Sequence, residues 1–127
     1  MIIKVDMRDD MGIPKELYEN MIQTGSSIIC NPPVTDTGID FVIYTKSFDR
    51  LLEWLMKERF KQTSEDAYDI SDESGFFCCF RKKKVNLIVV VDKELFNKWV
   101  EATLLAKRLN LRSKEQRVEL FRYFFEN

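Results

Sequence analysis

The spacing of apolar residues along this chain changes repeatedly between a strand pattern and a helix pattern. Short runs rich in β-branched and aromatic residues predict strands at 39–44, 75–81 and 85–91. Apolar residues recur at helical spacing at 48–59, 95–109 and 118–125. Because the two kinds of segment interleave, we expect an α+β fold with a mixed sheet of four or five strands covered by helices.

The ends of these segments carry residues that favour caps and turns. Ser47, Asp92 and Ser113 each stand at the expected start of one of these helices, so we expect them to be N-caps. Lys82–Lys84 separates two of the strands, which predicts an antiparallel hairpin beside strand 39–44. That strand is apolar on both faces, which favours a central position in a covered sheet.

The first part of the chain is expected to deliver a turn to this sheet. Residues 2–5 are a predicted edge strand, Pro14 suits the start of a helix running to about Asn20, and 21–24 is a predicted short strand that leads to Gly25. Asn31-Pro32-Pro33 cannot lie inside a helix and predicts an extended link to the following acids. Residues 64–74 are acidic and weakly apolar, which predicts a loop or the polar end of a hairpin.

Composition narrows the class of protein. The chain has 127 residues, 45% hydrophobic and 32% charged, which fits one globular domain over 1–127. The formal net charge of −1 gives no general attraction to nucleic acid or membrane, so any such binding needs a local patch. The basic run 81–84 could meet phosphates, or it could simply keep a hairpin tip soluble.

Histidine and cysteine usage excludes several kinds of chemistry. There is no histidine, so Ser-His and Cys-His nucleophiles and most transition-metal sites are excluded. The three cysteines, Cys30, Cys78 and Cys79, fit neither a disulfide framework nor a zinc site, which favours a reducing, cytoplasmic setting. With no apolar run of about 20 residues and no signal-peptide pattern, we expect no membrane association.

The candidate chemistry lies between Gly25 and Asp40. Gly25 permits a bend at which Ser26 and Ser27 can face phosphate oxygens, although an ordinary turn with a helix cap fits the same three residues. Asp36 and Asp40 have even offsets and would share one face of an extended segment. Two carboxylates gathered there repel each other, and a divalent cation such as Mg²⁺ would relieve the repulsion.

A family resemblance rests on a few stretches of this chain, namely Gly25-Ser26, Pro33-Val34-Thr35-Asp36-Thr37-Gly38-Ile39-Asp40, Asn86-Leu87-Ile88-Val89, 102–110 and 114–121. They resemble the polymerase-beta-type nucleotidyltransferase superfamily, whose members carry a Gly-Ser turn, an Asp-x-Asp pair at the start of a strand and a third carboxylate on a neighbouring strand. The chain is similar in particular to small phage-encoded nucleotidyltransferase-like proteins with a basic helical tail. The likeness spans roughly residue 24 to the C-terminus.

The resemblance implies a minimal nucleotidyltransferase-like fold and assigns roles to single residues. Asp36 and Asp40 would be catalytic and, with Asn86, would hold Mg²⁺. The first acid of the pair falls on Gly38 and the third on Asn86, so Asp36 would serve as a substitute ligand, brought inward by a bulge at Gly38. The resemblance would assign the nucleotide contacts to Gly25, Ser26, Ser27, Lys107 and Lys114.

Three functions remain open from the sequence. In the first, the protein is a Mg²⁺-dependent nucleotidyltransferase that moves a nucleotidyl group from a nucleoside triphosphate to RNA or protein. In the second, it is a catalytically inactive phage protein of the same fold, acting in the host cytoplasm, that binds a nucleotide or a host protein and regulates it. In the third, it is a structural interaction module. Gly38 and Asn86 favour the second, whereas Gly25, Ser26, Asp36 and Asp40 favour the first.

Overall fold

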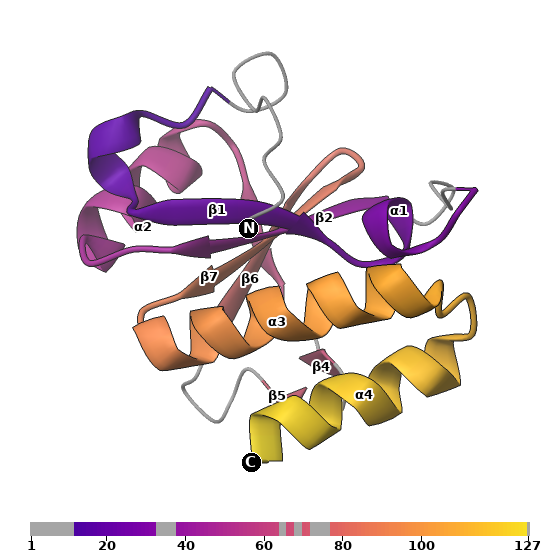
Figure 1. Cartoon of the computed structure of the whole chain (residues 1–127). Coiled ribbons are helices and arrows are strands. Elements are labelled where there is room, and N and C mark those ends of the chain that lie inside the picture. Colours follow the sequence, from indigo (N-terminus) through magenta and orange to yellow (C-terminus); the bar gives the residue numbers. More distant parts are fainter. Residues whose placement is uncertain (1–11, 33–37, 64–65, 68–69, 72–76, 127) are drawn as a thin grey trace.

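Figure 1 shows the computed structural model of the chain, which describes residues 12–32, 38–63, 66–67, 70–71 and 77–126. The five strands of its main sheet are β1 (Asn20–Thr24), β2 (Ile39–Tyr44), β3 (Lys61–Thr63), β6 (Phe77–Lys82) and β7 (Val85–Val90). They lie in the order β1-β2-β7-β6-β3, with β2 and β7 parallel and every other neighbouring pair antiparallel. The predicted α+β fold with a mixed sheet is therefore confirmed.

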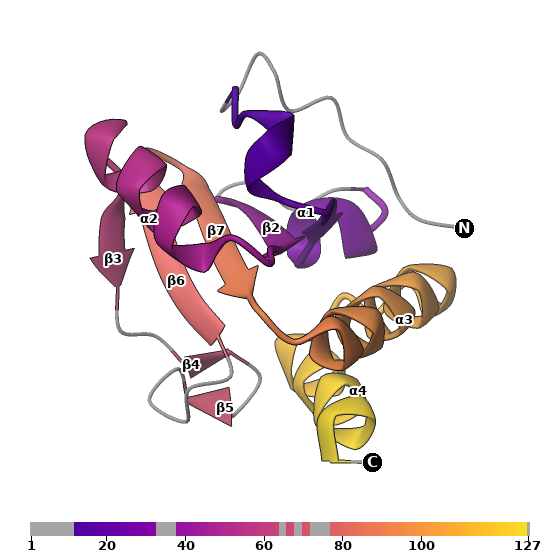
Figure 2. The same cartoon turned by 90° about the vertical axis from the view of Figure 1, so that its left-hand side faces the viewer.

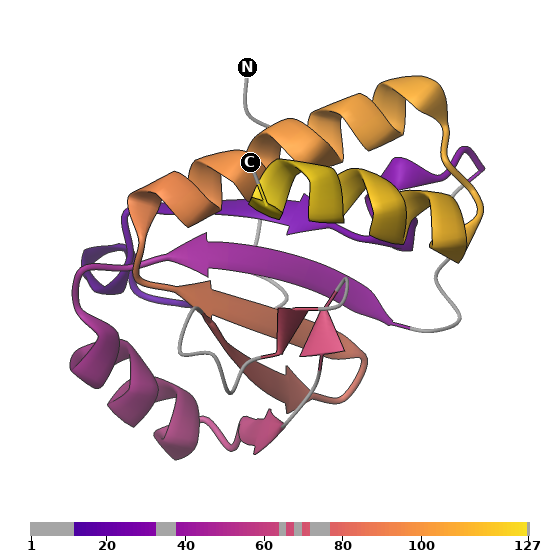
Figure 3. The same cartoon turned by 90° about the horizontal axis from the view of Figure 1, so that it is seen from below.

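Helices cover both faces of the sheet, as the buried strands require (Figures 2 and 3). On one face lie α3 (Lys93–Leu109), α4 (Lys114–Glu126) and the single turn α1 (Ser26–Ile29). On the other lie α2 (Phe48–Lys57) and the 3-10 turn η1 (Lys15–Leu17). In this strand order β2 and β7 each have a neighbouring strand on both sides, and apolar residues fill both of their faces.

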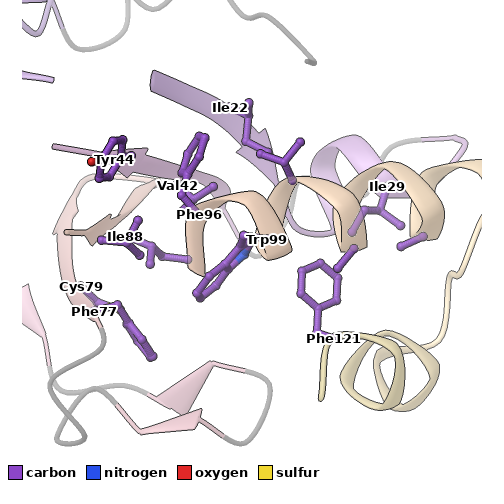
Figure 4. Packing of buried hydrophobic residues seen from close by; sticks show 14 residues of the cluster. Ile22, Ile29, Val42, Tyr44, Phe77, Cys79, Ile88, Phe96, Trp99 and Phe121 are labelled. Carbon is purple, nitrogen blue, oxygen red and sulfur yellow. The ribbon is translucent and has the colours of Figure 1, made fainter. Parts of the chain in front are cut away.

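The core on the α3 side is built around Trp99 (Figure 4). Its ring meets Phe77 edge-on at 5.7 Å between centroids, and it contacts Phe121 at 6.4 Å and Phe125 at 4.8 Å. The edge-to-face pairs with Phe77 and Phe121 suit the quadrupoles of aromatic rings. These contacts attach α4 to the sheet through α3.

A buried hydrogen bond ties α3 to the end of β1. The hydroxyl oxygens of Thr24 and Thr103 lie 2.8 Å apart, and Thr103 donates its hydroxyl hydrogen to the Trp99 carbonyl at 2.7 Å. Thr24 is therefore the donor to Thr103. Both side chains are buried, so the bond fixes α3 over the point where β1 ends.

The core on the other face takes the alternate residues of the same strands. Phe41, Phe80 and Leu87 pack against Leu51 and Leu55 of α2. Trp54 is half-buried beside Phe60, with ring centroids 6.3 Å apart, so it packs against the core as helix spacing suggests. The apolar face of α2 thus covers this side of the sheet.

Two of the three predicted N-cap residues form a capping hydrogen bond. Asp92 accepts a hydrogen bond from the Glu94 amide at 2.9 Å, and Ser113 Oγ accepts one from the Gln116 amide at 3.4 Å. Ser47 precedes α2 as expected, but its side chain makes no capping bond. Its own amide instead donates to Thr45 Oγ1 at 2.9 Å, which closes the turn between β2 and α2.

Several boundaries differ from the predictions. The helix expected over 14–20 is only the three-residue turn η1, because Tyr18 is already extended and the Glu19 amide bonds to the Tyr44 carbonyl, which brings the chain into the sheet. Strand β3 was not predicted. The acidic stretch contains a small hairpin of β4 (Asp66–Ala67) and β5 (Ile70–Ser71).

The strand predicted at 2–5 lies outside the described residues. Within the described part of the chain, no helix is both long enough and apolar enough to cross a lipid bilayer.

Candidate functional site

The Gly25 turn lies directly against Asp40. Gly25 follows β1 and has φ 77° and ψ −174°, a backbone conformation that is essentially restricted to glycine. A Cβ at this position would overlap Asp40 Oδ2 and lie 3.1 Å from Asp40 Cγ. Thr24 and Asp40 are also partners in the β1–β2 register. The structure therefore brings together the bend and the acid that the sequence analysis placed in one site.

Asp40 belongs to a polar row that crosses three strands. Asn86 is its register partner on β7, and Arg81 is the partner of Asn86 on β6. Asn86 Nδ2 donates to Asp40 Oδ1 at 2.8 Å, and Arg81 Nη1 donates to Asn86 Oδ1 at 2.8 Å. All three side chains are half-buried. Asn86 thus uses both ends of its amide to connect a carboxylate with a guanidinium.

The row lies on the α3 side of the sheet. Residues two positions further along each strand, Val42, Ile88 and Cys79, belong to the core cluster around Trp99, and side chains two apart share one face. The polar row is therefore the continuation of that apolar face toward the ends of the strands where α1 lies.

Gly38 closes one side of the row. Its φ is 112°, and a Cβ there would lie 2.7 Å from the Lys84 carbonyl oxygen, 3.5 Å from Asn86 Nδ2 and 3.6 Å from Arg81 Nη2. The Lys84 carbonyl is held in place because it accepts the Ile39 amide at 2.8 Å. Any side chain at position 38 would require this backbone contact to shift.

The described residues do not fit a Mg²⁺ site of the expected composition. Asp40 supplies a carboxylate, but the Asn86 oxygen that would ligate the ion accepts a hydrogen bond from Arg81, and Gly38 supplies no ligand. Across the ranges that the structure describes, no group of three acidic or cysteine residues is placed to hold a metal. Asp36, the predicted substitute ligand, lies outside those ranges.

The two serines have different surroundings. Ser26 is half-buried at the start of α1. Ser27 is buried, and its Oγ accepts a hydrogen bond from Gln23 Nε2 of β1 at 2.9 Å. The Ser27 hydroxyl oxygen is therefore engaged within the protein. Ser26 is the less buried of the two serines.

The two predicted lysines differ in their relation to the row. Lys107 Nζ donates to the Ile28 carbonyl at 3.2 Å, so Lys107 and Asp40 lie at the two ends of the single turn α1. Lys114 is exposed in the first turn of α4, and none of the contacts between described residues connects it to the polar row.

Basic and amide side chains at the α3–α4 corner also hold the chain that follows α1. Asn110 Oδ1 accepts the Asn31 amide at 2.8 Å, and Arg112 Nη1 donates to the Pro32 carbonyl at 2.8 Å. Arg117 Nη1 donates to the Leu111 and Arg112 carbonyls, each at 2.9 Å. Two arginines of this corner, Arg112 and Arg117, therefore bind backbone carbonyls.

Arg81 is the member of the polar row that the sequence analysis did not place in the candidate site. It was placed in a basic hairpin tip without a partner. A signal existed, because a turn of two residues at Lys83 and Lys84 puts Arg81 directly opposite Asn86.

Comparisons with family models, curated proteins and solved structures found no match to this chain.

Proposed function

We propose that this chain is a nucleotidyltransferase-like domain that binds a nucleoside triphosphate beside Gly25 and does not transfer its nucleotidyl group. One observation carries the proposal. The Gly25 turn lies against Asp40, and Asp40 is hydrogen-bonded to Asn86 on the neighbouring strand. These are the positions around which the family resemblance groups its phosphate turn and its carboxylates.

The residues found at the expected carboxylate positions are our reason to propose binding without transfer. Two of the three expected carboxylates are replaced, by Gly38 and Asn86, and an amide adds no negative charge to a metal site and cannot act as a base. Metal-assisted transfer depends on cations that neutralise charge on the reacting phosphates. The substitutions remove ligands for such ions and leave the phosphate turn in place.

The phosphate contacts in this proposal come from the residues around α1. Gly25 and Ser26 supply the turn, and Lys107 at the far end of α1 supplies a positive charge. A charged donor to phosphate forms a stronger hydrogen bond than a neutral one. Lys107 is therefore the side chain whose removal is expected to weaken binding most clearly.

The experiment incubates the protein with each labelled nucleoside triphosphate, Mg²⁺ or Mn²⁺ and total RNA, and measures both equilibrium binding and transfer of label. We expect binding of at least one nucleotide and no label on RNA or on the protein. Lys107→Met is expected to weaken binding by about tenfold. Arg108→Met is the matched control, because Arg108 is the next residue and is also exposed.

Each other outcome rejects the proposal in a specific way. Label transferred to RNA or protein, and lost in Asp40→Asn, would support the Mg²⁺-dependent enzyme with Asp36 and Asp40 as its carboxylates. Absence of binding to all four nucleotides would support the interaction module instead.

A further inference from the structure

The amide of Asn86 has a fixed orientation in the polar row. Its nitrogen faces the Asp40 carboxylate and its oxygen faces the Arg81 guanidinium, each at 2.8 Å. A guanidinium stays protonated at any physiological pH and has a rigid set of donors, so the acceptor facing it must be the amide oxygen. In this row the Asn86 side chain therefore lies between the positive charge of Arg81 and the Asp40 carboxylate.

Arg81 also borders the space that an acid at position 38 would occupy. The direction in which a side chain would leave Gly38 leads to the Lys84 carbonyl, to Asn86 Nδ2 and to Arg81 Nη2. In a carboxylate-lined metal site, that space and the third-acid position would both present oxygen ligands to a divalent cation. Here they present a backbone carbonyl, an amide nitrogen and a guanidinium.

We infer that Arg81 takes the place of the divalent cation in this site, so that the Asp40–Asn86–Arg81 row works without metal. The guanidinium offsets the charge of Asp40 through the bridging amide and repels an incoming Mg²⁺. Arg81 is linked through Asn86 and Asp40 to the Gly25 turn, where the proposed function places the triphosphate. The identity of that ligand rests on the proposed function, whereas the absence of a metal requirement does not.

The test uses Mn²⁺ as the probe, with binding followed by electron paramagnetic resonance. Wild type is expected to bind no Mn²⁺ at millimolar concentration. The double variant Arg81→Met with Asn86→Asp removes the cation and places a second carboxylate in register with Asp40. We expect it to gain Mn²⁺ affinity by at least about tenfold, because paired carboxylates at one site favour a divalent cation.

The matched control is Lys84→Met with Asn86→Asp. It carries the same change in net charge and lies in the same hairpin, but it keeps Arg81. We expect no gain in Mn²⁺ affinity from this variant. An equal gain in both variants, or no gain in the first, overturns the inference. So does stoichiometric Mn²⁺ binding by wild type that is lost in Asp40→Asn.

A second measurement decides the matter if the double variant does not fold. The melting temperature of wild type is expected to be the same in EDTA and in excess Mg²⁺, since a ligand that binds only the folded state would raise it. A rise with Mg²⁺ that disappears in Asp40→Asn overturns the inference.

Nucleotide binding to wild type is then compared with and without EDTA, and we expect affinities within about twofold. Binding that requires Mg²⁺ overturns the metal-free role of Arg81. If no nucleotide binds, the proposed function fails, while the Mn²⁺ measurement still decides the role of Arg81.

Discussion

Gly25 and Asp40 are packed so closely that a single added carbon on Gly25 would overlap the Asp40 carboxylate. The contact joins the end of β1 to the start of β2. Thr24 of β1 and Asp40 of β2 are register partners. The backbone conformation at Gly25 is independently restricted to glycine. Two separate physical reasons therefore require glycine at this position.

Gly25→Ala is expected to lower the free energy of unfolding by about 3 kcal/mol or more, because it adds both backbone strain and a steric overlap. Chemical denaturation of Gly25→Ala, Asp40→Ala and the double variant separates the two terms. The alanine at 25 should be less damaging in the Asp40→Ala background, since the overlapping oxygens are gone. Equal damage in both backgrounds would show that the carboxylate does not occupy this space.

The Thr24–Thr103 hydrogen bond gives a second prediction. Thr103→Val removes the acceptor for the Thr24 hydroxyl and leaves that group buried without its partner. We expect a loss of about 1 to 2 kcal/mol in unfolding free energy. The double variant Thr24→Val with Thr103→Val should lose less than the sum of the single changes, because no polar group is then left without a partner. Additive losses in a double-mutant cycle would contradict the bond.

Phe121 should account for much of the docking of α4. Its side chain is fully buried and its ring contacts Trp99 and Phe125. Phe121→Ala is expected to lower the unfolding free energy by about 3 to 5 kcal/mol. Tyr123→Ala on the same helix is the control and should change it by less than about 0.5 kcal/mol, because Tyr123 is 65% exposed. A similar loss from both variants would show that α4 is not docked through Phe121.

Asn110 combines a backbone role with a side-chain role. It ends α3 in the left-handed conformation, with φ 50°, and its amide exchanges two hydrogen bonds with the Asn31 backbone. Asn110→Gly keeps the conformation and loses the bonds, so we expect a loss of about 1 kcal/mol. Asn110→Ala also adds left-handed strain, so we expect about 2 kcal/mol. Urea denaturation of both variants measures the difference, and alanine no worse than glycine would exclude the strain.

Local patterns predicted the elements whose residues carry their own signal. Strands β2 and β7 and helices α3 and α4 follow from runs of β-branched residues, from helical spacing and from the caps Asp92 and Ser113. Strand β3 could not be predicted in this way. Its residues Lys61–Thr63 have little strand character, and they form a strand because they pair with β6.

Only part of the candidate site could be predicted, because some of its contacts depend on pairing between distant segments. The nearness of Gly25 to Asp40 follows from two strands that are consecutive in the sheet order. The parallel register of Asp40 with Asn86 joins segments 46 residues apart, and no local pattern specifies it. The role proposed for Arg81 depends on that register, because Asn86 links its guanidinium to Asp40.

Asn110 and Arg112 form hydrogen bonds with the backbone of Asn31 and Pro32, just after α1. At the other end of this one-turn helix, Gly25 packs against Asp40. A molecule that separates the last two helices from the sheet would therefore displace the turn beside Asp40 without any contact to that carboxylate.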